Sequence, residues 1–148
     1  MKATAVPGDA RRLATEAVAD GFELIVAAGG DGTVNEVLNG IGDAADGFAR
    51  ARFGVLPLGT VNVFAREIGL PLRIERAWET LQRGREARLD LPCVEFSANG
   101  VRRCCFCPLA IASMLCMIFE ARWQFRTVLS SAFSDSVLSS GFCAARAA

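Results

Sequence analysis

Five consecutive residues, Gly29-Gly30-Asp31-Gly32-Thr33, form the segment of this chain that is best suited to chemistry. They follow a continuous apolar run at 24–28, typical of a buried strand, and they precede apolar residues at helical spacing. The backbone N–H groups of such a loop can converge on an anion, and the start of the helix adds a partial positive charge. The loop therefore predicts a phosphate site.

Asp31 in the middle of this loop suggests a reaction as well as binding. A carboxylate beside phosphates repels them unless it holds a metal ion or takes a proton from an attacking hydroxyl. Both roles suit phosphoryl transfer, so Asp31 is the candidate catalytic residue. Asn35 and Glu36 lie in the first helical turn, within reach of a nucleotide's sugar or phosphates. The alternative is a simple tight turn in which Asp31 or Thr33 caps the helix.

A second loop, Pro57-Leu58-Gly59-Thr60, follows another apolar run at 53–56. The repeated order of strand, glycine loop and helix predicts a βαβ unit, and we expect the two bends to cup a triphosphate together. A dinucleotide-binding fingerprint is not present, because Asn35 stands where G-x-G-x-x-G requires a glycine.

Several classes of function are excluded by composition. The chain has no histidine, and Lys2 is its only lysine, which removes His-assisted nucleophiles, His metal sites and a Walker-type phosphate lysine. Sixteen basic residues balance sixteen acidic ones, so nucleic acid is not expected as a partner. The C-x-x-C at 104–107 has no second pair at zinc spacing, so no metal ligands are predicted. The chain start lacks the apolar region of a secretion signal, which predicts a cytoplasmic protein.

The remaining apolar periodicity indicates where the helices lie. Asp9 is the expected N-cap of a helix that ends at Gly21. Further helices are expected at 34–42, 62–68 and 74–84, with Phe64 and Trp78 in the core. Four scattered arginines are expected on the solvated surface, where they could also touch phosphates or anionic lipid headgroups: Arg66, Arg83, Arg85 and Arg88.

The pattern of apolar residues changes near residue 88 and divides the chain into two parts. Residues 1–87 read as an α/β lobe with a partial doubly wound parallel sheet, and 88–148 as the start of a β-rich lobe with a Cys-rich tail. Strands at 89–96 and 101–107 are expected to form a hairpin around Asn99-Gly100. An uncharged run at 104–119 is too short for a membrane-spanning helix and suggests buried strands. Beyond Cys107 the periodicity predicts no particular element.

The two loops with their flanking residues, GGDGTVNEVLNG at 29–40 and LPLGTVNVFAR at 56–66, resemble the diacylglycerol kinase catalytic domain family. The resemblance covers roughly residues 1–106. NAD kinases and phosphofructokinases share the GGDGT core, but the two extended strings together are similar to the bacterial lipid kinases. Thr4 matches a threonine that ends the family's second strand and contacts the nucleotide.

The resemblance implies an ATP-dependent kinase that uses Mg²⁺ and transfers the γ-phosphoryl group to a lipid hydroxyl, such as that of diacylglycerol, at a membrane surface. It implies that Asp31 is either the base or part of the metal network. The positions that match the family's nucleotide site are Thr4, Gly30, Asp31, Gly32, Thr33, Val34, Asn35, Glu36 and Thr60. A homodimer is a further form that we consider.

Departures from the family pattern shape the expectation about activity. Val63 stands where many members have aspartate, and the family's first strand and its Asp-Gly-Glu motif are not found. We therefore expect a truncated family member with an unrelated or out-of-frame tail after Cys107. The alternatives to a working lipid kinase are an inactive nucleotide-binding remnant, which is favoured for the chain as it stands, and a soluble NAD or sugar kinase.

Overall fold

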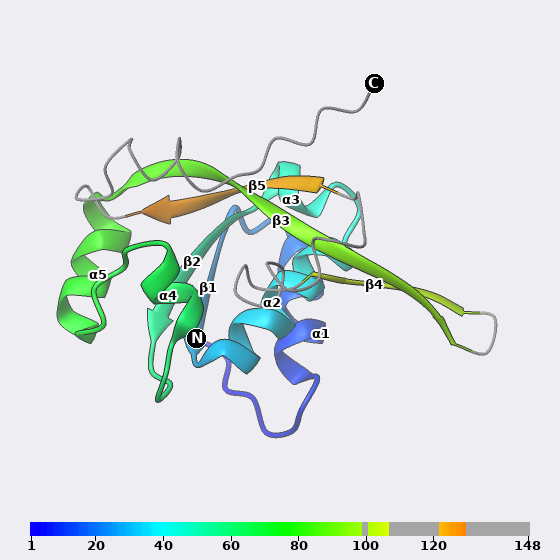
Figure 1. Cartoon of the computed structure of the whole chain (residues 1–148), viewed down its shortest axis with the longest axis horizontal. Coiled ribbons are helices and arrows are strands. Elements are labelled where there is room, and N and C mark those ends of the chain that lie inside the picture. Colours follow the sequence, from blue (N-terminus) through cyan, green and yellow to red (C-terminus); the bar gives the residue numbers. More distant parts are fainter. Residues whose placement is uncertain (99–100, 107–121, 130–148) are drawn as a thin grey trace.

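The computed structural model describes residues 1–98, 101–106 and 122–129 (Figure 1). Its elements in chain order are α1 (Asp9–Ala19), β1 (Leu24–Gly29), α2 (Asp31–Asp43), α3 (Gly47–Arg50), β2 (Arg52–Pro57), α4 (Val63–Glu67), α5 (Ile74–Arg83), β3 (Arg85–Ala98), β4 (Val101–Phe106) and β5 (Arg122–Leu129). The alternation of helices and strands up to residue 83 confirms the predicted α/β class. The part of the uncharged run at 104–119 that begins at residue 107 lies outside the described residues, as do residues 120–121 and 130–148 of the Cys-rich tail.

One mixed sheet runs through the molecule, with strand order β1-β2-β5-β3-β4. β1 and β2 are parallel, as predicted, with Leu24 opposite Arg52 and Gly29 opposite Pro57. β5 is parallel to β2 and antiparallel to β3, and β3 pairs antiparallel with β4. The β-rich segment therefore continues the same sheet through β5, a strand that the irregular pattern after residue 107 did not predict.

Helices cover both faces of this sheet. Successive strand residues point to opposite faces, and Leu81 of α5 packs over Gly54 of β2. The neighbouring Phe53 points to the other face, where its ring makes an edge contact with Phe64 of α4, the ring centroids being 6.0 Å apart. Phe53 and Phe64 are fully buried, which confirms the prediction that Phe64 belongs to the core.

Trp78 was expected in the core, and that prediction is wrong, because the Trp78 side chain is 50% exposed. Ala77 is the fully buried residue of α5. The helix thus meets β2 along a narrow face made by Ala77 and Leu81, and Trp78 lies at the margin of that face.

The start of α1 also differs from the prediction. The N-cap is Gly8, in the left-handed region at φ 92°, and Asp9 is the first helical residue. The Asp9 carboxylate accepts hydrogen bonds from the backbone N–H groups of Ala5 (2.9 Å) and Val6 (3.2 Å), which lower the pKa of Asp9. Asp9 therefore folds the preceding segment back instead of capping its own helix. No helix among the described residues is long and apolar enough to cross a bilayer.

Candidate functional site

The two glycine loops meet at the carboxyl ends of β1 and β2. Parallel pairing places Gly29 opposite Pro57, and the Leu58 N–H donates to the Gly29 carbonyl (3.0 Å). A Cβ on Gly30 would lie only 3.2 Å from the Cα of Gly59, so the two backbones touch. The expectation that both bends lie side by side is confirmed.

Asn62 closes the second loop on itself. Its backbone is left-handed (φ 53°), a conformation that asparagine tolerates better than most residues. Its buried side chain accepts a hydrogen bond from the Gly59 N–H (2.9 Å) and donates one to the Gly59 carbonyl (2.6 Å). The side-chain amide of Asn62 supplies the hydrogen bonds that a neighbouring strand would otherwise give to the Gly59 backbone. It thereby holds Gly59 against Gly30.

Asp31 links the two loops directly. Its carboxylate accepts hydrogen bonds from the backbone N–H groups of Val63 and Phe64, both at 3.1 Å. These are the first two residues of α4, so Asp31 caps a helix that follows 32 residues later in the chain. Capping by Asp31 was anticipated only for its own helix, α2.

The contact between Asp31 and α4 bears on how a carboxylate can lie next to phosphates. A carboxylate next to phosphates was expected to require a metal ion or a proton. In the structure, two backbone N–H groups at the start of α4 already donate hydrogen bonds to the Asp31 carboxylate. A short-range pattern could not predict this, because the donors become neighbours only when β1 and β2 pair.

The start of α2 supplies further N–H donors. The first hydrogen bond within this helix runs from the Val34 N–H to the Gly30 carbonyl (3.0 Å). The N–H groups of the three residues before Val34, at 31–33, therefore have no partner inside the helix and are available to an anion. Val34 itself is buried in the core, so only its backbone belongs to the loop region.

Two predicted site residues are held by neighbouring groups. The Glu36 carboxylate accepts hydrogen bonds from the Gly8 N–H (2.9 Å) and the Ala10 N–H (3.1 Å), so it caps α1. The Asn35 side-chain oxygen accepts a hydrogen bond from the Nδ2 of buried Asn39. Both residues thus have structural contacts in addition to any contact with a nucleotide.

The three predicted threonines lie in different surroundings. Thr60 is exposed in the second loop, and the Thr33 side chain lies against Gly29. Thr4 is exposed, and the segment before α1 forms no strand, contrary to the expectation that Thr4 ends one. The first residues of the chain instead run beside β1, which is one of the two edge strands of the described sheet.

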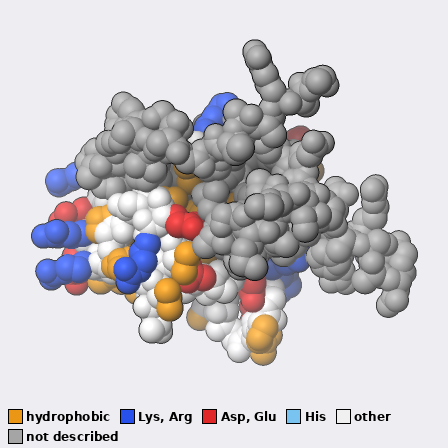
Figure 2. Space-filling model, viewed as in Figure 1, with side chains coloured by type: hydrophobic (Ala, Val, Ile, Leu, Met, Phe, Trp, Pro, Cys, Tyr) orange, Lys and Arg blue, Asp and Glu red, His pale blue; other side chains and the backbone are white. Residues whose placement is uncertain are grey.

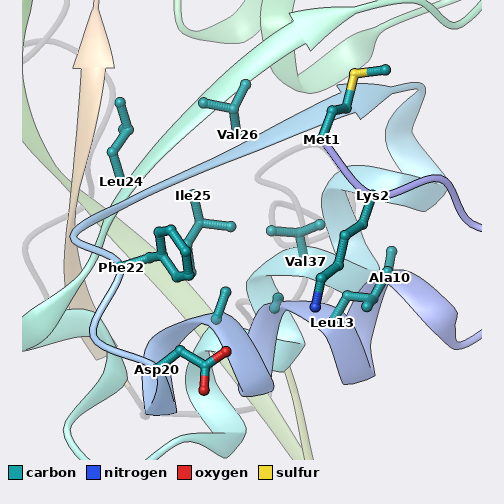
Figure 3. Close-up of a pocket in the computed structure, with 12 residues that line it drawn as sticks. Met1, Lys2, Ala10, Leu13, Asp20, Phe22, Leu24, Ile25, Val26 and Val37 are labelled. Carbon is teal, nitrogen blue, oxygen red and sulfur yellow. The ribbon is translucent and has the colours of Figure 1, made fainter.

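The groove beside β1 is a separate feature, with a volume of about 300 Å³ (Figure 3). Apolar side chains of α1 and β1 dominate its lining, and Lys2 and Asp20 are its charged members. Phosphate binding requires converging N–H donors or cations, so this groove is poorly suited to the chemistry of the two loops.

Glu67, at the end of α4, is a carboxylate that the sequence did not single out. Its Oε2 atom is buried and has no hydrogen-bond partner within the described part of the chain. Burial raises the pKa of Glu67, and the nearby negative charge of Asp31 raises it further. No local sequence pattern singles it out, because Glu67 and Asp31 come near each other only in the folded chain.

A Glu67→Gln substitution is expected to stabilise the protein at neutral pH by up to about 1 kcal/mol, since partial access to solvent limits the gain. The wild-type carboxyl stabilises the fold fully below its ordinary pKa of 4.5 and loses that contribution as pH rises through its higher folded value. Denaturation of both proteins across this range should show the advantage vanishing in acid. Curves of unfolding free energy against pH that run parallel for the two proteins would contradict the raised pKa of Glu67. An equal change in stability for the exposed control Glu79→Gln would contradict it as well.

Three comparisons identify the family. The model of the diacylglycerol kinase catalytic domain matches residues 1–94. The chain is 44% identical over 90 residues to diacylglycerol kinase of Bacillus subtilis and 40% identical over 89 residues to that of Staphylococcus carnosus, covering 60% of this chain in both cases. It spans 29% and 28% of those relatives, less than a third of their length.

A solved structure agrees with this match. The crystal structure of a diacylglycerol kinase from Bacillus anthracis superposes with a TM-score of 0.55 at 31% identity, over 67% of this chain and 32% of that one. The matched region contains both glycine loops, Asp31 and the helix that Asp31 caps. The chain belongs to the diacylglycerol kinase catalytic domain family.

Proposed function

We propose that this chain provides the ATP-binding part of a lipid kinase that transfers the γ-phosphoryl group of ATP to the hydroxyl of a diacylglycerol-like lipid at a membrane surface. The observation that carries the proposal is the bond of Asp31 to the start of α4. It joins the two phosphate-compatible loops, whose backbones are in contact. The names of the relatives, diacylglycerol kinases, support the choice of a lipid acceptor.

The binding step follows from the geometry of the junction. The N–H groups at 31–33, which have no partner within α2, and the positive end of α2 would receive phosphate oxygens. Gly30 and Gly59 have no side chains, so the nucleotide can approach both backbones closely. Phosphoryl transfer depends mainly on positioning and charge stabilisation, and the joined loops would supply the positioning.

Asp31 acts in this proposal chiefly by positioning. Each of its oxygens already accepts one amide hydrogen bond and retains a second lone pair. Mg²⁺ typically binds one or two carboxylates together with substrate phosphates, and Asp31 with its free lone pairs fits that requirement. No group of three acidic, Cys or His side chains that could hold a metal unaided occurs in the described residues. Mg²⁺ would supply neutralisation of the phosphate charge when bound with ATP.

The test combines a binding measurement with an activity measurement on the full chain. ATP·Mg²⁺ is titrated calorimetrically in the absence of lipid, and transfer of labelled γ-phosphate is followed to diacylglycerol, NAD or a sugar. We expect ATP binding and labelled phosphatidic acid, with Asp31→Ala reducing transfer on the order of 10²-fold or more. The matched control is Asp43→Ala on the same helix, which removes only an exposed ion pair with Arg11.

The outcomes separate the alternatives. Failure of the wild-type chain to bind ATP would overturn the proposal. ATP binding without transfer to any acceptor would support a nucleotide-binding domain without catalysis, and transfer to NAD or a sugar would support a soluble kinase. Equal transfer by the wild type and Asp31→Ala would remove Asp31 from the mechanism.

A further inference from the structure

Exposed aliphatic side chains gather at the end of the sheet that carries the phosphate loops. Leu58 and Val61, in the loop that leaves the carboxyl end of β2, are 55% and 58% exposed. α5 runs back alongside β2, so its first turn lies toward the same end (Figure 1). Leu72 and Ile74 lie at this first turn and are also exposed. We call these four residues the carboxyl-end rim: Leu58, Val61, Leu72 and Ile74.

Two arginines accompany the carboxyl-end rim. The Arg66 side chain lies over the second loop, because its Nε donates to the Val61 carbonyl (2.8 Å). Arg73 stands between Leu72 and Ile74 and is strongly exposed, with only a loose contact of 3.9 Å to Glu75. Figure 2 shows basic, acidic and hydrophobic side chains side by side over this part of the molecule, where Glu75 is also exposed. The face therefore combines apolar contact area with the exposed guanidinium group of Arg73 and with Arg66.

We infer that the carboxyl-end rim docks onto an anionic lipid bilayer. Aliphatic side chains interleaved with arginines match the interface of such a bilayer, where acyl chains lie directly beneath phosphate headgroups. A protein partner would favour a continuous apolar centre, whereas here each arginine directly adjoins an aliphatic residue. The inference rests on the proposed function, because a lipid acceptor must be reached at the membrane.

The placement of the carboxyl-end rim gives the docking a consequence for the reaction. Leu58 and Val61 flank Gly59 and Thr60 in one loop, and Gly59 touches Gly30. Insertion of these two side chains into the headgroup layer would therefore hold the phosphate loops facing the bilayer. A lipid hydroxyl at the interface would then lie on the same side as the bound nucleotide.

Vesicle binding without nucleotide tests this inference. The full chain is sedimented with phosphatidylcholine vesicles that contain or lack phosphatidylglycerol. We expect binding to the anionic vesicles, a loss of about tenfold or more for the double variant Leu58→Ser/Val61→Ser, and a loss of about fivefold for Arg73→Gln. The matched control is Phe22→Ser, which removes a 61% exposed apolar side chain at the opposite end of β1 and should bind like the wild type.

Each outcome bears on one proposal. Equal binding by the wild type and the double variant, or an equal loss with Phe22→Ser, would overturn the docking inference. Concentration-dependent self-association that the double variant abolishes, without vesicle binding, would overturn it in favour of a second copy of the chain. Vesicle binding without ATP binding would support the docking inference and refute the proposed kinase function. Kinase activity on micellar lipid without vesicle binding would support the kinase function and refute the docking inference.

Discussion

A Gly59→Ala variant is expected to lose about 2–3 kcal/mol of stability and to lose ATP binding with it, because the added methyl group overpacks the junction of the two loops. The new Cβ would overlap the Cα of Gly30 and would lie 2.8 Å from the Oδ1 of Asn62 and 3.2 Å from the Gly30 nitrogen. Two of these three neighbours are backbone atoms, which cannot rotate away as a flexible side chain can. Relief therefore requires the loops to separate, which would pull α4 away from Asp31.

Gly32→Ala, in the adjacent loop, is the matched control for this variant. A Cβ on Gly32 meets nothing within 4 Å, and the residue lies inside α2. Replacing an unhindered helical glycine by alanine stabilises by about 0.5–1 kcal/mol. Denaturant unfolding of both variants should give stability changes of opposite sign, and ATP titration of Gly59→Ala should show the loss of binding. Equal behaviour of the two would show that the contact between the loops does not determine the stability of the junction.

The parts of the fold that were predictable share one property, which is that their signals are local. The apolar run at 24–28 and the helical spacing after Thr33 each predict their own element. Two such units in series predict a parallel pair, and the parallel pair places both loops at one edge. The adjacency of Gly30 and Gly59 thus followed from periodicity and topology alone.

The roles of individual side chains were less predictable, because they depend on contacts between distant residues. Asp31 caps α4, and Glu36 caps α1, 26 residues before it in the chain. Both carboxylates belong to a sequence motif that is typical of phosphate binding. Nothing in that motif indicates that the start of another helix lies nearby in the folded chain. The prediction for Trp78 was wrong for a related reason, because helical spacing alone does not show how narrow the buried face of α5 is.

Glu36 illustrates the difference between a motif residue and a site residue, and its replacement provides a decisive measurement. Glu36→Ala removes two charge-assisted hydrogen bonds from the start of α1, to Gly8 and Ala10, and is expected to cost about 2 kcal/mol of stability. Glu36→Gln keeps the size but loses the charge and one acceptor oxygen, so about half of this loss is expected.

The control for these variants is Glu16→Gln, in the exposed ion pair with Arg12, which should change stability by less than about 0.5 kcal/mol. ATP affinity, measured where every variant is folded, separates capping from nucleotide contact. Because both Glu36 oxygens are directed at α1, the affinity should stay within about threefold of the wild type. A large loss of ATP affinity at unchanged stability would show that Glu36 contacts the nucleotide. It would also mean that α1 is held in place only by its packing against α2.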